Sequence, residues 1–249
     1  MTSETLVLLC VAIAVVAFLY SAVGHAGASG YIAVMTLFGL AAEEIKPAAL
    51  ALNILVASLA SWQFWRARHF SWPLFWPFVV LSIPLAYRGG SYALPLSLFK
   101  ALIGFVLLYS AVRFFWEGRG GRDADVAAIH PPPKPIAFAV GGGIGLLSGL
   151  TGTGGGIFLT PLMLFLRWAP TRTAAAVSAF FILVNSIAGL LGNLRSTGRL
   201  PTVTLSVALA AIAGGAIGSY LGSRSFSPLM IKRLLAAVLL IAGCKLLFA

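Results

Sequence analysis

The chain has 249 residues, of which 60% are hydrophobic and 9% are charged, and its mean hydropathy is +1.00. An ordinary soluble domain carries about 25% charged residues, so this composition excludes a water-soluble surface and predicts a protein embedded in lipid. The net charge of +11 does not indicate nucleic-acid binding, because the basic residues stand singly in short connections between apolar runs.

Ten apolar segments follow one another along the chain, five before and five after a polar stretch at residues 117–134. Because Glu4 precedes the first segment, where a signal peptide would have basic residues, we expect that segment to be a retained helix. The composition and the segment count predict an all-α, polytopic membrane protein with a transmembrane repeat at residues 1–116, a linker at 117–134 and a second repeat at 135–249. The expected segments are Leu6–Val23, Gly30–Leu40, Pro47–Trp65, Trp72–Tyr87, Pro95–Trp116, Pro135–Leu150, Gly155–Arg167, Thr173–Leu194, Pro201–Leu221 and Pro228–Phe248.

An internal repeat is visible when the sequence is shifted by 125 residues. The shift places Gly27 on Gly152 and Gly30 on Gly155, and the order of elements also coincides: a Gly-rich turn, a short helix, a charged loop and a long helix. Since five segments is an odd number, the second half is expected to enter the membrane from the opposite side, as an inverted-topology repeat. The same parity holds if each Gly-rich turn joins broken or re-entrant half-helices.

The distribution of Lys and Arg predicts the orientation. If every segment crosses and the linker at 117–134 is cytoplasmic, 11 of the 17 basic residues lie inside and 6 lie outside. We therefore expect a multi-pass protein of a bacterial-type inner membrane, with a cytoplasmic linker. The six outside residues are Lys46, Arg88, Lys100, Arg195, Arg199 and Lys245.

Two Gly-rich turns interrupt the apolar regions in corresponding places of the two halves. Glycine lets backbone N–H groups face a ligand, and the start of the following helix favours negative charge, so the pair predicts an anion site made from discontinuous helices. Close helix packing by small residues is the alternative explanation. The candidate anion-binding residues are Gly24, His25, Gly27, Ser29 and Gly30 in the first turn, and Thr151, Gly152, Thr153, Gly154, Gly155 and Gly156 in the second.

Other polar residues of the apolar segments are further candidates. His25 could couple proton movement to anion movement or donate a hydrogen bond to the ligand, and a structural histidine is the alternative. The long third segment of each repeat also contains polar residues, and a polar side chain there faces either a transport path or a partner helix. The candidates are Asn53, Ser58, Ser61, Ser178, Asn185 and Ser186, of which Asn53, Ser178 and Asn185 are assigned to the site.

Enzyme motifs are missing from the sequence. It contains no G-x-S-x-G, no H-E-x-x-H and no phosphate-binding loop, and its apolar segments contain no acidic residue. Cys10 and Cys244 have no second Cys or His at the spacing of metal ligands. We therefore expect no enzymatic activity, no metal and no cofactor.

The second turn and the helix after it, from Gly149 to Leu162, resemble the duplicated Gly-rich motif of the sulfite exporter TauE/SafE family of membrane permeases. The resemblance covers nearly the whole chain. The first copy, from Gly24 to Leu37, departs from the motif, since Tyr31 and Thr36 stand where the second copy has Gly156 and Pro161. The resemblance implies secondary transport of sulfur-containing anions such as sulfite or organosulfonates.

The expected function is a secondary transporter that moves a small inorganic or organosulfur anion across the bilayer by alternating access, with a proton as the candidate coupling ion. A passive anion channel and a non-transporting membrane accessory protein are the alternatives. The sequence predicts neither the direction of transport nor the oligomeric state.

Overall fold

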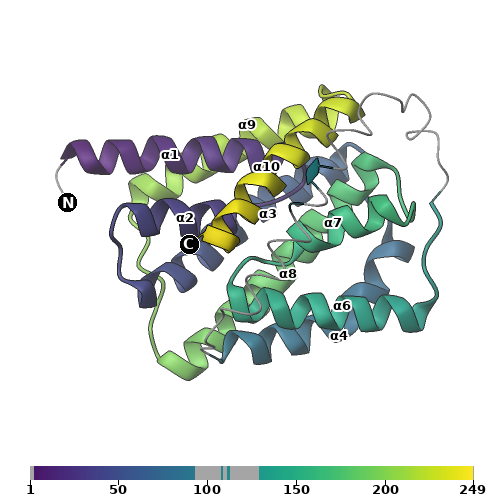
Figure 1. Ribbon diagram of the computed structural model, residues 1–249, viewed down its shortest axis with the longest axis horizontal. Coiled ribbons are helices and arrows are strands. Elements are labelled where there is room, and N and C mark those ends of the chain that lie inside the picture. Colours follow the sequence, from purple (N-terminus) through teal and green to yellow (C-terminus); the bar gives the residue numbers. More distant parts are fainter. Residues whose placement is uncertain (1–2, 93–107, 109–110, 113–128, 249) are drawn as a thin grey trace.

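The computed structural model describes residues 3–92, 108, 111–112 and 129–248, and within these residues it contains nine helices and no strand (Figure 1). Their bounds lie within five residues of the predicted segments. Lys100, residues 117–128 of the predicted linker and most of the segment Pro95–Trp116 lie outside the described residues. The helices are α1 (Ser3–Ala22), α2 (Ala28–Leu37), α3 (Ala42–Arg66), α4 (Trp72–Gly90), α6 (Lys134–Thr151), α7 (Gly156–Phe165), α8 (Thr171–Thr197), α9 (Leu205–Arg224) and α10 (Pro228–Phe248).

The prediction of an all-α, polytopic membrane protein is confirmed. Among the described residues, five helices are long and apolar enough to cross a bilayer: α1, α3, α6, α8 and α9. Helices α2 and α7 have 10 residues each, or about 15 Å, which is roughly half of a hydrocarbon core. Among the helices that the structure describes, the two that follow the Gly-rich turns are therefore the short ones.

Two parallel helix pairs, α4 with α6 and α1 with α9, are held together by stripes of glycine. In α6, Gly141, Gly145 and Gly149 lie directly against the backbone of Phe78, Ser82 and Ala86 of α4. In α9, Gly214, Gly218 and Gly222 lie in the same way against Ala14, Phe18 and Ala22 of α1. In lipid, where the hydrophobic effect does not drive helices together, such close backbone approach gives the dispersion contacts that do.

The long helices run in two opposite directions. Helix α3 is antiparallel to α8, since Asn53 contacts Ser186 whereas Phe64, further along α3, lies beside Ala175. Helix α4 is parallel to α8, because Ser82 bonds Asn185 and Ser91 bonds Gly192. Helix α3 is parallel to α9, as Val56 lies beside Gly215 and Gln63 is bound by Arg224.

It follows that α1, α3 and α9 point one way and α4, α6 and α8 the other. Among the described helices, α1, α3 and α4 of the first half are thus antiparallel to α6, α8 and α9 of the second, which is the pattern that an inverted repeat requires. Two apolar clusters follow this division. One joins α1, α2 and α3 to α9 and also includes Ile182 of α8, and the second joins α6, α7 and α8 to α4. A further cluster packs Ile231 and Leu235 of α10 against Val23 and Ile157 beside the turns. Helices α3 and α8 cross where the first two clusters meet.

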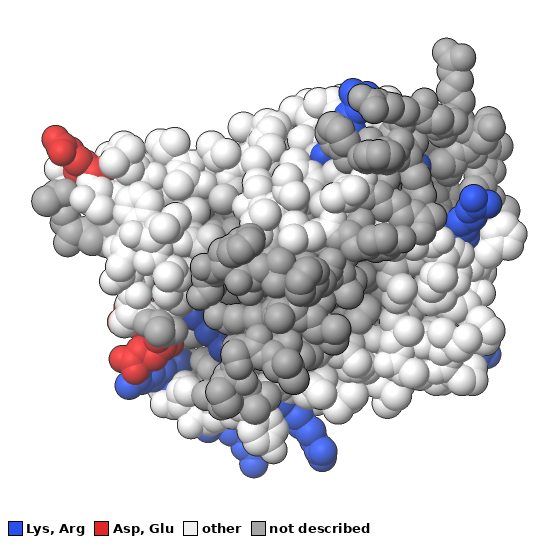
Figure 2. Space-filling model, in the orientation of Figure 1, with Lys and Arg blue, Asp and Glu red and all other residues white. Residues whose placement is uncertain are grey.

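Charged side chains gather at two ends of the helix bundle. We call residues 38–46, 88–92 and 193–204 the Arg199 end, and residues 66–71, 166–172 and 224–227 the Arg224 end. Figure 2 shows charged side chains toward the lower left and toward the upper right and right of one face. Among the described residues of the Arg224 end there are five Arg and no Asp or Glu, whereas the Arg199 end also has Glu43 and Glu44.

The two halves match in the structure at a shift of 128 residues around the turns, three more than the sequence shift of 125. Gly24 and Gly152 are left-handed, with φ of 78° and 74°, and so are Gly27 and Gly155, with φ of 101° and 83°. Helices α2 and α7 then begin and end at equivalent positions. The structural counterpart of Gly156 is therefore Ala28, and the sequence-based pairing of Tyr31 with Gly156 is wrong.

Candidate functional site

The first turn links α1 to α2 and is buried from Ser21 to Ala28. Gly24 lies so close to the backbone of Ala175 in α8 that a side chain would not fit, and its positive φ also favours glycine. Gly27, the residue before α2, lies against the ring of Tyr31. The first half thus places its turn directly against a helix of the second half.

The second turn links α6 to α7 and has three left-handed glycines, Gly152, Gly154 and Gly155. A Cβ atom on Gly154 would lie 2.7 Å from Ile182, 2.8 Å from Nδ2 of Asn53 and 2.9 Å from Oγ of Ser186. Bare backbone at this position is therefore required for the second turn to reach α3, which belongs to the first half.

Asn53 of α3 bonds both helix-turn regions. Its Oδ1 accepts a hydrogen bond from the backbone N–H of Ala28 at the start of α2, at 2.9 Å. Its Nδ2 donates to the carbonyl of Thr153 in the second turn and to Oγ of Ser186 on α8, each at 3.3 Å. The side chain is fully buried, where an unpaired carboxamide would be costly, so these bonds fix the distance between the two halves.

His25 begins a chain of hydrogen bonds that also crosses between the halves. Its Nε2 lies 2.8 Å from Oγ1 of Thr160 on α7, and Thr160 donates to Oγ of Ser178 on α8 at 2.6 Å. If the single hydroxyl proton of Thr160 is donated to Ser178, Nε2 must be the donor to Thr160. In the neutral ring Nδ1 then carries a lone pair and no proton.

Three buried polar atoms beside the turns are left without a hydrogen bond inside the described part of the chain. The first is Nδ1 of His25, a residue that is 2% exposed, which lies near the backbone of Gly156. The second is the hydroxyl of Tyr31, which lies against Gly27, and the third is Oγ of Ser148, whose side chain lies against Gly155. Buried polar groups are normally paired, so atoms of this kind indicate a place where a ligand can bind.

The second turn is the more accessible of the two. Thr151 and Thr153 are half-buried, and their hydroxyls bond each other at 2.8 Å. Thr151 Oγ1 also donates to the carbonyl of Leu147. Gly152, between them, lies against the side chain of Lys46 on α3. Around the turns the structure thus provides glycine backbone, hydroxyls, a carboxamide and a histidine, and the described residues contain no cluster of metal ligands.

The sequence profile described as Sulfite exporter TauE/SafE matches residues 9–246 of the chain. The chain belongs to this family. It is 38% identical over 240 residues to the probable membrane transporter protein y4hK of Sinorhizobium fredii, a match that covers 96% of this chain and 97% of that protein. It is also 31% identical over 177 residues to the probable membrane transporter protein YunE of Bacillus subtilis, covering 65% of this chain and 62% of that protein.

No solved structure matches the chain significantly. Membership of the TauE/SafE family, together with relatives described as membrane transporters, makes this chain a membrane transporter and not an enzyme. The resemblance seen in the Gly-rich motif is confirmed over nearly the whole sequence.

Most of the residues proposed for anion binding in this TauE/SafE protein lie around the two turns. His25, Asn53 and Ser178 take part in the hydrogen bonds that connect the halves. The residues of the turns themselves are Gly24, Gly27, Thr151, Gly152, Thr153, Gly154, Gly155 and Gly156. Their role in binding stays a prediction.

Three of the proposed residues are placed elsewhere or are already occupied. Gly30 lies against Val16 of α1 and serves the packing of α1 on α2. Ser29 bonds the hydroxyl of Tyr20 at 2.9 Å. Asn185 accepts a hydrogen bond from Ser82 of α4 and donates to the carbonyl of Phe181 at 2.8 Å, so both ends of its amide join α4 to α8 rather than facing the turns.

Thr160 and Lys46 were absent from the predicted site, and Ser186 was a candidate that was not assigned to it. Thr160 and Ser186 are single hydroxyl residues in apolar helices, and only their partners in the other half distinguish them. The spacing also favours Ser186, because Ser178, Ile182 and Ser186 recur every four residues and share one face of α8. Lys46 had been considered only as one of the basic residues from which the orientation in the membrane is predicted.

Proposed function

We propose that this transporter carries a small oxyanion, sulfite or an organosulfonate, across a bacterial inner membrane by alternating access, and that the anion binds between the two Gly-rich turns. The observation that carries the proposal is Asn53, which bonds the start of α2 and the second turn at once. A single side chain therefore bonds both halves at once, although their helices run in opposite directions.

The chemistry around the turns suits an anion. Left-handed glycines let the turns before α2 and α7 pack closely against α8 and α3, and helix starts favour negative charge. The unpaired Oγ of Ser148 can donate a hydrogen bond to an oxygen atom. The hydroxyls of Thr151 and Thr153 can do so by rotating away from their present acceptors, which are the carbonyl of Leu147 and Oγ1 of Thr151. The substrate class, sulfur oxyanions, comes from the family to which the chain belongs.

His25 provides a way to couple protons to the anion. In the neutral ring Nδ1 presents a lone pair, which repels an oxyanion. Protonation makes Nδ1 a donor and adds a positive charge, so anion binding and proton binding favour each other. His25 then carries one proton with each anion that it helps to bind.

Alternating access follows from the arrangement of the halves. The first turn is buried from Ser21 to Ala28, so an anion there is closed off from water in this conformation. Among the described residues at the depth of the turns, the polar contacts between the cluster of α1, α2, α3 and α9 and the cluster of α4, α6, α7 and α8 are those of Asn53 and of His25 with Thr160. Rocking of one cluster against the other about α3 and α8 would break these contacts and open the turns to either side.

Transport assays on the purified protein in liposomes test the proposal. Uptake of labelled sulfite or of short sulfonates should saturate with concentration, and preloaded unlabelled anion should accelerate it by counterflow. Non-saturating flux without counterflow would identify a passive anion channel instead. Absence of flux for sulfite, sulfate, thiosulfate and short sulfonates would refute transport of small anions and favour an accessory role.

A further inference from the structure

Lys46 lies on the face of α3 that follows the second turn. Lys46, Leu50 and Asn53 are separated by four and three residues and therefore share one side of the helix. A Cβ atom on Gly152 would lie 3.1 Å from Cγ of Lys46 and 3.9 Å from Cγ of Leu50. One side of α3 thus runs along the second turn, with an ammonium group toward the Arg199 end and the carboxamide of Asn53 further in.

The ammonium group of Lys46 is bound only by carbonyl groups among the described residues. Its Nζ donates to the carbonyl of Gly90 at 3.2 Å and to that of Tyr92 at 3.4 Å, both at the end of α4. An ammonium group has three N–H donors, so one is left for another acceptor. Carbonyls carry only partial negative charge, and the formal positive charge of Lys46 is therefore not neutralised by them.

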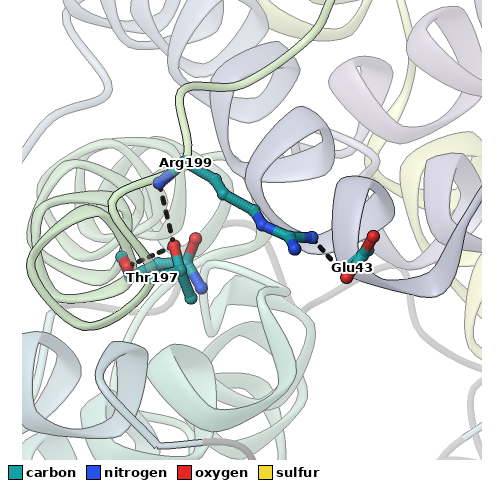
Figure 3. Close-up of polar contacts among 4 residues, drawn as sticks. Glu43, Thr197 and Arg199 are labelled. Carbon is teal, nitrogen blue, oxygen red and sulfur yellow. Dashed lines mark hydrogen bonds and ion pairs between the residues drawn. The ribbon is translucent and has the colours of Figure 1, made fainter.

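Glu43, one of the two carboxylates in the first turn of α3, is already paired with another residue, and Lys46 forms no ion pair with the other, Glu44, among the described residues. Glu43 forms an ion pair with Arg199, and the backbone N–H of Arg199 is bound in turn by Oγ1 of Thr197 (Figure 3). In the described ranges 3–92 and 129–248, Lys46 has no ion pair with Asp or Glu. A half-buried lysine next to a membrane-embedded turn thus keeps a positive charge that the protein does not balance there.

We infer that Lys46 selects anions at the Arg199 end of the transport path, its ammonium group drawing a small anion to the half-buried hydroxyls of Thr151 and Thr153. This inference rests on the proposed transport function. A positive charge at a narrow, partly dry opening raises the local concentration of anions and excludes cations. Lys46 is therefore a specificity-determining residue, and Asn53 and His25 lie further along the path.

The competing explanation is a structural one, in which Lys46 only binds the last carbonyls of α4 as a helix-end anchor. The two explanations are separated by Lys46→Gln, because glutamine keeps N–H donors for these carbonyls and loses the charge. Lys46→Arg keeps the charge and changes the shape. Arg195→Gln is the matched control, since it removes one positive charge from the same end at a residue that bonds the hydroxyl of Tyr87 and not the turns.

The experiment measures the concentration dependence of sulfite and sulfonate flux in liposomes. We expect Lys46→Gln to raise KM about tenfold while changing the maximal rate less than about twofold, and Lys46→Arg and Arg195→Gln to leave KM within about twofold of wild type. An unchanged KM in Lys46→Gln, or an equal rise in Arg195→Gln, would overturn the inference while leaving transport itself established. No flux in the wild-type protein would instead refute the proposed function.

A second variant leaves Lys46 in place, in case Lys46→Gln does not fold. Tyr92 is 62% exposed, and its carbonyl accepts a hydrogen bond from Lys46. Tyr92→Glu brings a carboxylate close enough to neutralise the ammonium group, so KM should rise as in Lys46→Gln, whereas Tyr92→Gln should have the wild-type KM. Equal KM values for these two variants would contradict the inference.

Discussion

At the scale of single residues, Asn53 makes the two turns chemically different. It binds the backbone at the start of α2, whereas the start of α7 is covered by the apolar side chains of Phe181 and Ile182. No side-chain hydrogen bond caps the start of α7 at Gly155, the residue before this helix. The two turns are therefore asymmetric in their side-chain contacts although the backbone repeats.

Asn53→Asp tests this role with a side chain of the same shape. The carboxylate can still accept from the N–H of Ala28, but it cannot donate to Thr153 or Ser186, and its charge repels an anion. We expect sulfite flux to fall at least about tenfold in protein that still purifies as folded material. Ser58→Ala on the same helix is the control, because Ser58 is exposed and bonds only the carbonyl of Ile54, and its flux should not change. Full activity of Asn53→Asp would remove Asn53 from the site.

His25→Gln tests proton coupling. The amide of glutamine can replace Nε2 as the partner of Thr160 but cannot take up a proton. Methanesulfonate is the suitable substrate, because its charge does not change near neutral pH. Wild-type flux should rise when the side from which the anion departs is made acidic, since protonated His25 binds the anion more tightly, and His25→Gln should keep downhill flux without this response. A pH response of equal size in both proteins would exclude His25 as the proton carrier.

At the scale of helices, the glycine stripes decide how closely the halves approach. Gly145 of α6 lies on the backbone of Ser82 in α4, while Gly143 of the same helix has open space around it. Replacing glycine by alanine should therefore destabilise the protein at position 145 and not at position 143, although the two positions are only two residues apart. This pair separates a packing requirement from the general effect of removing glycine from a helix.

Gly145→Ala should destabilise the protein by about 1–3 kcal/mol, because the added methyl group must push α4 away. Gly143→Ala should be neutral or stabilising by up to about 1 kcal/mol, because alanine is the better helix former. Thermal unfolding in detergent, followed by circular dichroism, measures both. Equal unfolding temperatures for the two variants would show that α4 and α6 do not depend on this close contact.

At the scale of the whole molecule, the sequence predicts the helices well and the contacts between the halves poorly. Apolar length defines the segments, and the two Gly-rich turns are visible because glycine is needed where φ is positive. The shift that aligns the two halves residue by residue is harder to predict from the sequence. Gly39 corresponds to Arg167, and both have positive φ, so the backbone repeats where the residue type does not. Because few residues are identical between the halves, matching residue types selected a shift of 125 residues, whereas the backbone repeats at a shift of 128.

The partners of polar side chains depend on how α3 crosses α8, which no local pattern specifies. Asn185 was grouped with Asn53 because each is a carboxamide in the long helix of its repeat. In the structure Asn185 is directed to Ser82 of α4, and the hydroxyl of Ser186, one residue later, faces Asn53 instead. Successive helical residues are about 100° apart, so a one-residue difference moves a side chain from one neighbouring helix to another.

The orientation in the membrane follows from the two charged ends and can be tested by labelling. Lys and Arg are enriched on the cytoplasmic side of membrane proteins, and the described Arg224 end has five Arg without an acidic residue, so that end should face the cytoplasm. Leu200→Cys places a thiol at the Arg199 end, where Leu200 is 75% exposed. Ser225→Cys places one at the exposed turn after α9. The background needs Cys10→Ala and Cys244→Ala, because both native cysteines are free and partly buried.

A membrane-impermeant maleimide should label Leu200→Cys from outside intact cells whose outer membrane is permeable to it, and should label Ser225→Cys only in inverted membrane vesicles. The reverse pattern would show that the Arg199 end is cytoplasmic and that the positive charges do not set the orientation. Labelling of both cysteines from the same side would have a stronger consequence. Helix α9 joins these two positions, so it would then not cross the bilayer, and the opposed directions of α4 and α9 could not arise from an inverted repeat.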